Sequence, residues 1–135
     1  MKAAVTIIRW EAKVLLLRRT SGDPSGWGDH WCLPGGRCDQ GEDPFDAALR
    51  ETLEETGIVI PRSMLMIRPH RYKATDARGR VYEIQAHYAL TVGLDPPAVT
   101  LSDEHDAFLW VGIDEYQELV MGDATRRILD ELRGA

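Results

Sequence analysis

Three features that would assign this chain to a special class of protein are missing from its sequence. No apolar run is long enough to span a bilayer and the first residues lack a signal-peptide pattern, so we expect a cytoplasmic protein. A basic excess is also missing, because 16 Lys and Arg residues stand against 22 Asp and Glu residues and the net charge is -6. The sequence therefore predicts neither a membrane protein nor a binder of nucleic-acid polymers.

Cysteines are few as well, and their arrangement argues against a disulfide framework. Cys32 and Cys38 are the two cysteines of the chain, and their spacing fits no common zinc signature. We therefore predict reduced thiols without a special role. The chain has 135 residues, of which 44% are hydrophobic, and contains no linker-like or repeated segment. These properties predict a single domain over residues 1–135 with a sizeable core.

Three glutamates are crowded on one side of a predicted helix. Glu51, Glu54 and Glu55 stand at positions i, i+3 and i+4, which are neighbours on a helical surface. Like charges placed so closely repel one another, so the arrangement costs stability unless a cation lies between them. A hard divalent ion such as Mg²⁺ suits an all-oxygen cluster of this kind.

The helix that carries these glutamates has recognisable ends. Asp43 is a good N-cap, Pro44 fits the first helical position, and Asp46 places negative charge in the first turn. Gly57 is suited to a left-handed residue at the C-terminal end. The less polar positions form one stripe roughly opposite the glutamates, namely Phe45, Ala48, Leu49, Thr52 and Thr56. We therefore expect one face of the helix to pack and the other to line a cleft.

The segment from Gly36 to Ile58 resembles a known family motif. Its sequence, GRCDQGEDPFDAALRETLEETGI, matches the pattern GX5EX7REUXEEXGU of the Nudix hydrolases (MutT-like), in which U is a bulky aliphatic residue. Every fixed letter is present, and the one departure is Thr52 at an aliphatic position. Because Thr52 lies on the packing stripe, we expect a slightly looser core and an unaltered glutamate face.

A glutamate-rich helical face is more often solvated surface than a metal site. Here the capped helix, the preceding Pro34-Gly35-Gly36 turn and Arg50 favour the metal site. Arg50 has two interpretations, as an i,i+4 partner of Glu54 or, as the resemblance implies, as a partner of Glu42 that holds Glu51 in position. Both interpretations stay open.

Strands and helices are predicted to mix without strict βαβ alternation. The glutamate helix is followed by a short helix capped by Asp114 and a final helix that starts near Asp123 and buries Ile128, Leu129 and Leu132. The pattern predicts an α/β (α+β) fold with a mixed sheet between helices, and the resemblance implies the Nudix-type α/β/α sandwich. Strands are expected over 3–9, 14–18, 64–68, 81–92 and 108–111, and loops over 20–31, 70–80 and 94–103.

The resemblance implies Mg²⁺-dependent hydrolysis of a pyrophosphate bond in a nucleotide, with a nucleoside monophosphate as one product. Mg²⁺, for which Mn²⁺ can substitute, would be held by the Gly35 carbonyl, Glu51, Glu54 and Glu55. Such an ion would neutralise charge on the phosphoryl oxygens and lower the pKa of a bound water. The number of ions stays open.

The catalytic candidates are Glu54, Glu51, Arg50 and Glu104. Members of the family differ in whether the general base is a box glutamate or one on a downstream loop, and Glu104 is the downstream candidate. Glu104 is equally well explained as an exposed loop acid. For its neighbour His105, a role at the surface is expected rather than one in substrate binding.

Substrate contacts are predicted from basic and aromatic residues. Arg18 and Arg19 end a strand that should run towards the cleft, so we expect one of them to reach a phosphate. Trp27, Trp31, Tyr72 and Tyr88 are candidates to stack on a nucleobase, and Trp27 and Tyr72 are the two predicted to bind substrate. The basic residues of segment 70–80 can steer an anion, although a solvated loop is the simpler account.

The sequence does not single out one nucleotide as the substrate. Markers of ADP-ribose, coenzyme A and NADH hydrolases are missing around the box, and Tyr72 is a poor match to the tyrosine of dinucleoside polyphosphate hydrolases. A nucleoside triphosphate is the leading small-molecule substrate, with ADP-ribose, nucleotide sugars and dinucleoside polyphosphates as alternatives. A nucleotide-sensing module without catalysis is the alternative of a different class, although the intact box argues against it. Family members often form homodimers, but nothing in the sequence shows an interface.

Overall fold

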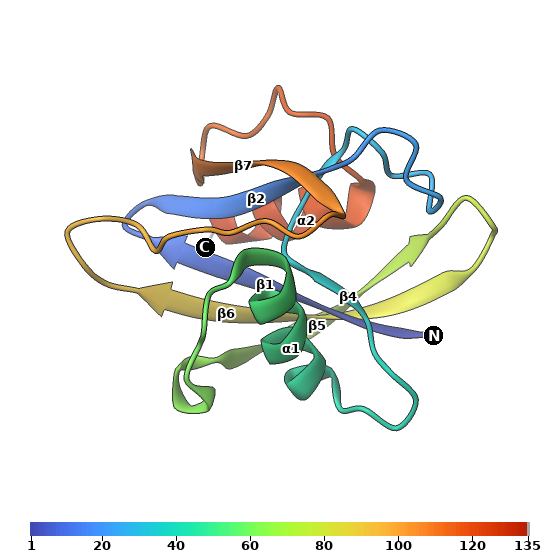
Figure 1. Ribbon diagram of the computed structural model, residues 1–135, viewed down its shortest axis with the longest axis horizontal. Helices are drawn as coiled ribbons and strands as arrows, with labels where there is room; N and C mark the ends of the chain where they lie inside the picture. The colour runs from blue at the N-terminus through green and yellow to red at the C-terminus, as the bar shows by residue number, and fades with distance from the viewer. Residues whose placement is uncertain (135) are drawn as a thin grey trace.

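The computed structural model describes residues 1–134, so Ala135 of the predicted domain lies outside the described residues. Seven strands form one mixed sheet in the order β3-β2-β1-β6-β5, with β4 paired to β1 and β7 paired to β2 (Figure 1). Within this part of the chain, no helix combines the length and apolar character needed to cross a bilayer. The elements are β1 (Lys2–Trp10), β2 (Lys13–Arg19), β3 (Trp31–Cys32), β4 (Gly35–Arg37), α1 (Pro44–Thr56), a 3-10 turn η1 (Arg62–Met64), β5 (Met66–Thr75), β6 (Val81–Thr91), β7 (His105–Gly112) and α2 (Asp123–Arg133).

β1 and β2 form a hairpin and then separate. Their register pairs Arg9 with Val14 and Trp10 with Lys13, close to the turn. On its other edge β1 is bonded to the parallel strand β6 along its length, and β2 is likewise bonded to the antiparallel strand β7. Farther from the turn, β1 also pairs with β4 and β2 with β3. The start of β4 therefore lies at the same end of the hairpin as the last residues of β2 and the first residues of β7. This end of the molecule carries the candidate site.

The two helices cover opposite faces of the sheet, with α1 in front and α2 behind in the view of Figure 1. Successive side chains of a strand point to opposite faces, so Ile8 of β1 packs with α1 while Ile7 packs with α2. From α1 the buried apolar residues are Ala47 and Ala48, and from α2 they are Ile128, Leu129 and Leu132. The structure confirms the predicted α/β class, with a mixed sheet between helices.

Local capping signals set both ends of α1. The side chain of Asp43 accepts a hydrogen bond of 2.8 Å from the backbone N–H of Phe45, and Pro44 is the first helical residue. Gly57 has φ of 72°, a left-handed conformation that favours glycine, and its N–H donates to the carbonyl of Leu53. These contacts confirm the predicted helix, and they fix the direction in which the glutamates leave the backbone.

The predicted loop over residues 70–80 is wrong for most of its length. β5 continues to Thr75 and pairs with β6, and its register shifts between Ile67 and Arg71, where Pro69 cannot donate to the ladder. β5 is the last strand of the sheet order, and most of its side chains are exposed. A polar edge strand of this kind lacks the apolar alternation on which the sequence prediction depends.

The short helix predicted after Asp114 is also wrong. Two separate turns occupy this segment, closed by hydrogen bonds from Glu115 N–H to the Gly112 carbonyl and from Leu119 N–H to the Tyr116 carbonyl. Each bond spans three residues, and no α-helical ladder follows it. The final helix begins at Asp123, as predicted.

Thr52, the residue that departs from the family pattern, is fully buried beneath α1. Its hydroxyl donates a 3.2 Å hydrogen bond to the hydroxyl oxygen of Thr6 on β1, which is also fully buried. A buried hydroxyl that loses its partner costs more than the net strength of the bond. The threonine at this position is therefore matched to a second threonine across the helix–sheet interface.

We expect Thr52→Val to lower the free energy of unfolding by about 1 kcal/mol, because it leaves the Thr6 oxygen without a donor. The double variant Thr6→Val/Thr52→Val should regain most of that loss, since both hydroxyls are then removed. Urea unfolding of the three proteins measures both changes. Equal losses in the single and double variants would show that the hydroxyl pair is not the cause.

Candidate active site

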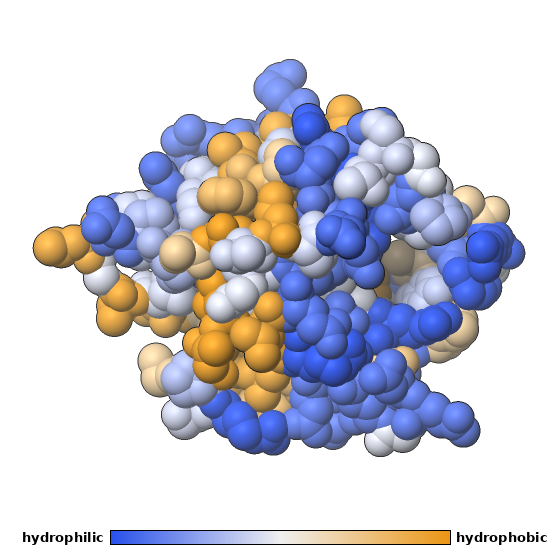
Figure 2. All heavy atoms as spheres, in the orientation of Figure 1, coloured by the Kyte–Doolittle hydropathy of each residue, from blue (hydrophilic) through white to orange (hydrophobic). Residues whose placement is uncertain are grey.

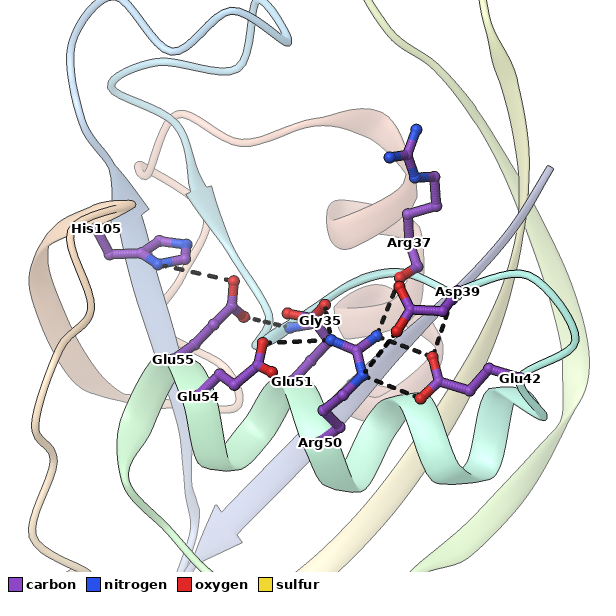
Figure 3. A network of polar contacts seen from close by, with 9 residues as sticks. All are labelled: Gly35, Arg37, Asp39, Glu42, Arg50, Glu51, Glu54, Glu55 and His105. Carbon is purple, nitrogen blue, oxygen red and sulfur yellow. Dashed lines mark hydrogen bonds and ion pairs between the residues drawn. The ribbon is translucent and has the colours of Figure 1, made fainter.

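Arg50 lies at the centre of the polar network on the exposed face of α1 (Figure 3). Its Nε and Nη2 donate to the two carboxylate oxygens of Glu42 at 3.0 and 2.9 Å, a two-point contact that fixes the plane of the guanidinium. Its Nη1 donates to Glu51 Oε1 at 2.8 Å and to Glu54 Oε2 at 3.2 Å. Both partnerships considered for Arg50 from the sequence are thus present together.

These contacts bind the charges of the network tightly to one another. The hydrogen bond to Glu42 is the largest cause that raises the pKa of Arg50 above its ordinary value, and the same bond lowers the pKa of Glu42. Arg50 Nη2 also lies 3.3 Å from the Arg37 carbonyl, so the helix is tied to the end of β4. A positive charge is therefore held permanently between the carboxylates of α1.

Glu55 occupies a different environment from the other glutamates of α1. It is 2% exposed, and its Oε1 accepts a 2.7 Å hydrogen bond from the backbone N–H of Gly35. Its Oε2 is buried and has no hydrogen-bond partner among the described residues. Burial raises the pKa of Glu55 to about 9, and burial also raises the pKa of Glu51. Glu55 is thus the carboxylate that most needs a positive partner.

Glu104 and His105 come together with Glu55 at the start of β7. One ligand atom from each of the three residues lies within 4.8 Å of the others. The expected surface role of His105 is wrong, because the residue is 4% exposed and its side chain lies inside the molecule. The burial pattern of β7 has no strict alternation, so the sequence does not indicate which way His105 faces.

His105 and Glu55 approach without forming an ion pair. His105 Nδ1 lies 3.9 Å from Glu55 Oε2, a distance that would suit opposite charges. Burial and the nearby Arg19 lower the pKa of His105 to about 4, whereas burial raises that of Glu55 to about 9. At neutral pH both groups are therefore uncharged, so the contact is not an ion pair.

The residues of this cluster fit a divalent cation on two observations. The orphaned Glu55 Oε2 is turned towards Glu104 and His105, so unused donor atoms converge on one point. A Cβ on Gly36 would lie 3.0 Å from the Glu51 carboxylate, so glycine at this position leaves the carboxylate its room. Carboxylate oxygens suit Mg²⁺ or Mn²⁺, whereas an imidazole nitrogen is not a ligand that Mg²⁺ prefers.

The predicted metal ligands are not all placed alike. Glu51 lies close to Glu55 and Glu104, while the Glu54 side chain is 56% exposed and rests against Arg50. Gly35 contacts Glu55 through its N–H, not its carbonyl. The ligand roles of Gly35, Glu51, Glu54 and Glu55 stay predictions.

A cavity of about 880 Å³ opens beside the carboxylates. Glu51 and Glu104 line it, together with Arg19 from the end of β2 and Trp27 from the loop after β2. The N–H of Ala77 on the β5–β6 hairpin donates a 2.9 Å bond to the carbonyl of Ser25, so the hairpin meets that loop beside the cavity. In the view of Figure 2 this side of the molecule, on the right, is mostly hydrophilic, while an apolar band lies left of centre.

The two adjacent arginines at the end of β2 have different surroundings. Arg19 lines the cavity, and its guanidinium contacts Asp23 at 3.3 Å. Arg18 does not line it, and forms a 2.9 Å ion pair with Asp106 on β7. Neighbouring residues of a strand face opposite sides, which accounts for the difference.

Trp27 and Tyr72, the two predicted aromatic contacts, also lie in different surroundings. Trp27 lines the cavity and packs over Gly122 at the start of α2, where an added Cβ would lie 3.0 Å from its ring. Tyr72 is 1% exposed, belongs to the core beneath α2, and donates a hydrogen bond to Glu131. Its ring is covered by protein, so we leave Tyr72 out of the substrate-binding group.

Both cysteines are free thiols, as predicted. Burial raises the pKa of Cys32 to about 12, so its thiol stays protonated at neutral pH. Its Sγ lies 3.7 Å from His105 Nε2 and 3.5 Å from the Leu17 carbonyl.

The shifted pKa of Glu55 predicts how pH acts on the metal-free protein. Between the ordinary value of 4.5 and about 9, the native state keeps a proton that the unfolded chain releases. Stability should therefore fall as pH rises through this range in EDTA, and the slope should be smaller in Glu55→Gln. Because a metal needs the ionised carboxylate, Mg²⁺ should raise the melting temperature more at pH 8.5 than at pH 6.5. Parallel stability curves for the two proteins would contradict this assignment.

Comparisons with known proteins agree on the family. The family model for the NUDIX domain matches residues 1–132. The asymmetrical bis(5'-nucleosyl)-tetraphosphatase of Rattus norvegicus is 30% identical over 76% of this chain and 69% of its own length. The RNA pyrophosphohydrolase of Bartonella quintana (strain Toulouse) is 27% identical over 97% of this chain and 88% of its own length. The crystal structure of the MutT protein from Methanosarcina mazei Go1 superposes with a TM-score of 0.81 and 22% identity, covering 97% of this chain and 91% of that one. The chain therefore belongs to the Nudix family of hydrolases, which act on pyrophosphate bonds.

Proposed function

We propose that this Nudix hydrolase cleaves a nucleoside triphosphate and releases a nucleoside monophosphate. The observation that carries the proposal is a single cavity that Glu51 and Glu104 line together with Arg19 and Trp27. In such a cavity the carboxylates can hold a cation that contacts the phosphates, and the guanidinium can meet the remaining phosphate charge. The aromatic ring can stack on the base.

Mg²⁺ is the proposed cofactor, with Mn²⁺ as a substitute, and Glu51, Glu54, Glu55 and the Gly35 carbonyl are its proposed ligands. When bound there, a divalent ion supplies neutralisation of phosphoryl charge and a water of lowered pKa. Arg50 keeps Glu51 and Glu54 in place through the contacts of 2.8 and 3.2 Å. The hydrogen bond from Gly35 N–H holds one oxygen of Glu55 and leaves the other free for the cation.

Two carboxylates remain candidates for the base that accepts the proton of the attacking water. Glu54 is exposed at the helix surface and is oriented by Arg50. Glu104 lies beside Glu55 and lines the cavity. Either is reached by solvent, as a base that exchanges protons with bulk water must be.

Arg19 and Trp27 are the proposed substrate contacts. Arg19 is already positioned by Asp23, so its guanidinium faces the cavity at little further cost in side-chain entropy. Trp27 is held against the start of α2 and lines the cavity, where its ring is the proposed surface for a base. Arg18, paired with Asp106, is left out of this group.

A dinucleoside polyphosphate is the second candidate substrate. The β5–β6 hairpin places Lys73, Arg78 and Arg80 on the cavity, together with the ring of Tyr82. These basic residues extend the positive surface beyond what Arg19 provides, which suits a longer phosphate chain. The similarity to the rat tetraphosphatase supports the same candidate.

We expect Glu54→Gln to lower kcat by at least about 100-fold if Glu54 is the base or a metal ligand, and Glu104→Gln to lower it less. The opposite order would assign the base to Glu104. Steady-state rates with Mg²⁺ at saturating substrate measure both variants. Undiminished turnover in Glu54→Gln would remove Glu54 from the catalytic group.

Arg19→Ala should weaken substrate binding and raise KM by roughly 10-fold, because a charge-assisted contact to phosphate is lost. Arg18→Ala is the matched comparison on the neighbouring residue, and its effect on KM should be much smaller. Equal effects of the two variants would contradict the placement of Arg19 alone in the substrate cavity.

The substrate class is tested with one panel of compounds. Nucleoside triphosphates, dinucleoside polyphosphates, ADP-ribose, nucleotide sugars and a short RNA with a 5'-triphosphate are incubated with Mg²⁺ or Mn²⁺, and products are identified by chromatography. We expect the highest kcat/KM for a nucleoside triphosphate, with a monophosphate product. A clear preference for a dinucleoside polyphosphate would favour the second candidate, and binding without turnover of any compound would favour a nucleotide sensor.

A further inference from the structure

His105 is a buried polar residue to which the proposed reaction assigns no role. It is the first residue of β7 and pairs in the sheet with Arg19 of β2. Its side chain is inaccessible to solvent, yet its Nδ1 has no hydrogen-bond partner among the residues that the structure describes. A buried polar atom left without a partner is costly, so its position calls for a physical reason.

The atom that faces His105 Nδ1 is itself without a partner. Glu55 Oε2 lies 3.9 Å away, and it too is buried and unbonded among the described residues. The other oxygen of the same carboxylate is held by Gly35 N–H at 2.7 Å. A shift of less than about 1 Å would close the gap to an ordinary N–H···O bond. The close-up in Figure 3 shows the imidazole and the carboxylate pointing towards each other from β7 and α1.

Cys32 provides the third member of this arrangement. Its Sγ lies 3.7 Å from His105 Nε2, on the opposite side of the ring from Glu55. When a cation is bound, Glu55 is ionised and can only accept hydrogen bonds, so a bond from His105 to Glu55 then requires a proton on Nδ1. Nε2 of the neutral ring must then accept. The S–H group of Cys32 has two acceptors within reach, the Leu17 carbonyl at 3.5 Å and Nε2 at 3.7 Å, and turning to Nε2 it favours the tautomer that the carboxylate needs.

We propose that His105 is a positioning residue that donates from Nδ1 to one lone pair of Glu55 Oε2 and leaves the other lone pair of this oxygen directed at the cation. The proposal rests on the proposed function in one respect, because it takes Glu55 as a metal ligand. Hydrogen bonds to a ligating carboxylate fix its direction and tune its affinity, and their loss typically weakens metal binding by roughly 10- to 100-fold. Cys32 acts one step farther away, through the tautomer of the ring.

The test uses two variants that separate the ring nitrogens. The amide NH₂ of asparagine reaches approximately the place of Nδ1, whereas that of glutamine reaches the place of Nε2. His105→Asn therefore keeps a donor for Glu55, and His105→Gln keeps only the contact to Cys32. We expect His105→Gln to weaken Mn²⁺ binding by at least about 10-fold and His105→Asn by about 3-fold or less. Electron paramagnetic resonance of free Mn²⁺, titrated with the full chain, measures the dissociation constants without turnover.

Thermal unfolding in EDTA provides the control for folding. If both variants lose the same stability but differ in Mn²⁺ affinity as stated, the loss of Mn²⁺ affinity is caused by the changed hydrogen bond to Glu55 and not by a disturbed core. Equal Mn²⁺ affinities for the two variants would overturn the proposal. If both kept the wild-type affinity, His105 would have no part in the site, and if both lost affinity equally, a direct imidazole ligand would be the better account.

A second measurement on the wild-type protein does not depend on any variant. In the ¹⁵N NMR spectrum of the Mg²⁺-loaded chain, we expect the protonated nitrogen of His105 to be Nδ1, and Cys32→Ala to shift the population towards the Nε2–H tautomer. A proton on Nε2 in the wild-type protein would overturn the proposal. A wild-type chain that binds no Mn²⁺ would instead count against the proposed function, so the two failures are distinguishable.

Discussion

Negative charge collected at the junction of α1 with the sheet is the constraint on which the rest of the site depends. Glu51, Glu54 and Glu55 share one side of a helix, and like charges at such spacing destabilise it. The fold meets this cost in two ways. Arg50 offsets part of the charge of Glu51 and Glu54 through contacts of 2.8 and 3.2 Å, and burial keeps Glu55 protonated when no cation is bound. Glu55 Oε2 is left without a hydrogen-bond partner within residues 1–134.

The fold places the unpaired oxygen of Glu55 where a phosphate can reach a cation bound to it. Because β1 and β2 separate beyond their turn, the start of β4 and the start of β7 come to the same end of the sheet. β4 brings the Gly35 N–H to one oxygen of Glu55, and β7 brings His105 opposite the other. The cavity of about 880 Å³ opens beside this point. The capping of α1, the separation of β1 and β2, and the buried carboxylate therefore all contribute to one site.

Sequence reasoning succeeded where the information is local. Asp43 and Gly57 define α1 through contacts within a few residues, so its bounds and its glutamate face were predictable. It failed where tertiary pairing decides. β5 is a polar edge strand that is ordered by β6, and Tyr72 within it is buried by α2, which no periodic pattern indicates. The inward position of His105 likewise depends on the register between β2 and β7. The family motif itself says nothing of either contact.

The central claim is that the carboxylates of α1 and Glu104 hold a divalent cation beside a nucleotide phosphate. Anomalous diffraction from crystals soaked with Mn²⁺ and a non-hydrolysable nucleotide tests it directly. The account predicts a manganese peak about 2.0–2.3 Å from Glu55 Oε2 and from at least one further carboxylate, with a phosphate oxygen completing the coordination. Clear density for the nucleotide in the cavity without a manganese peak at Glu55 would contradict it.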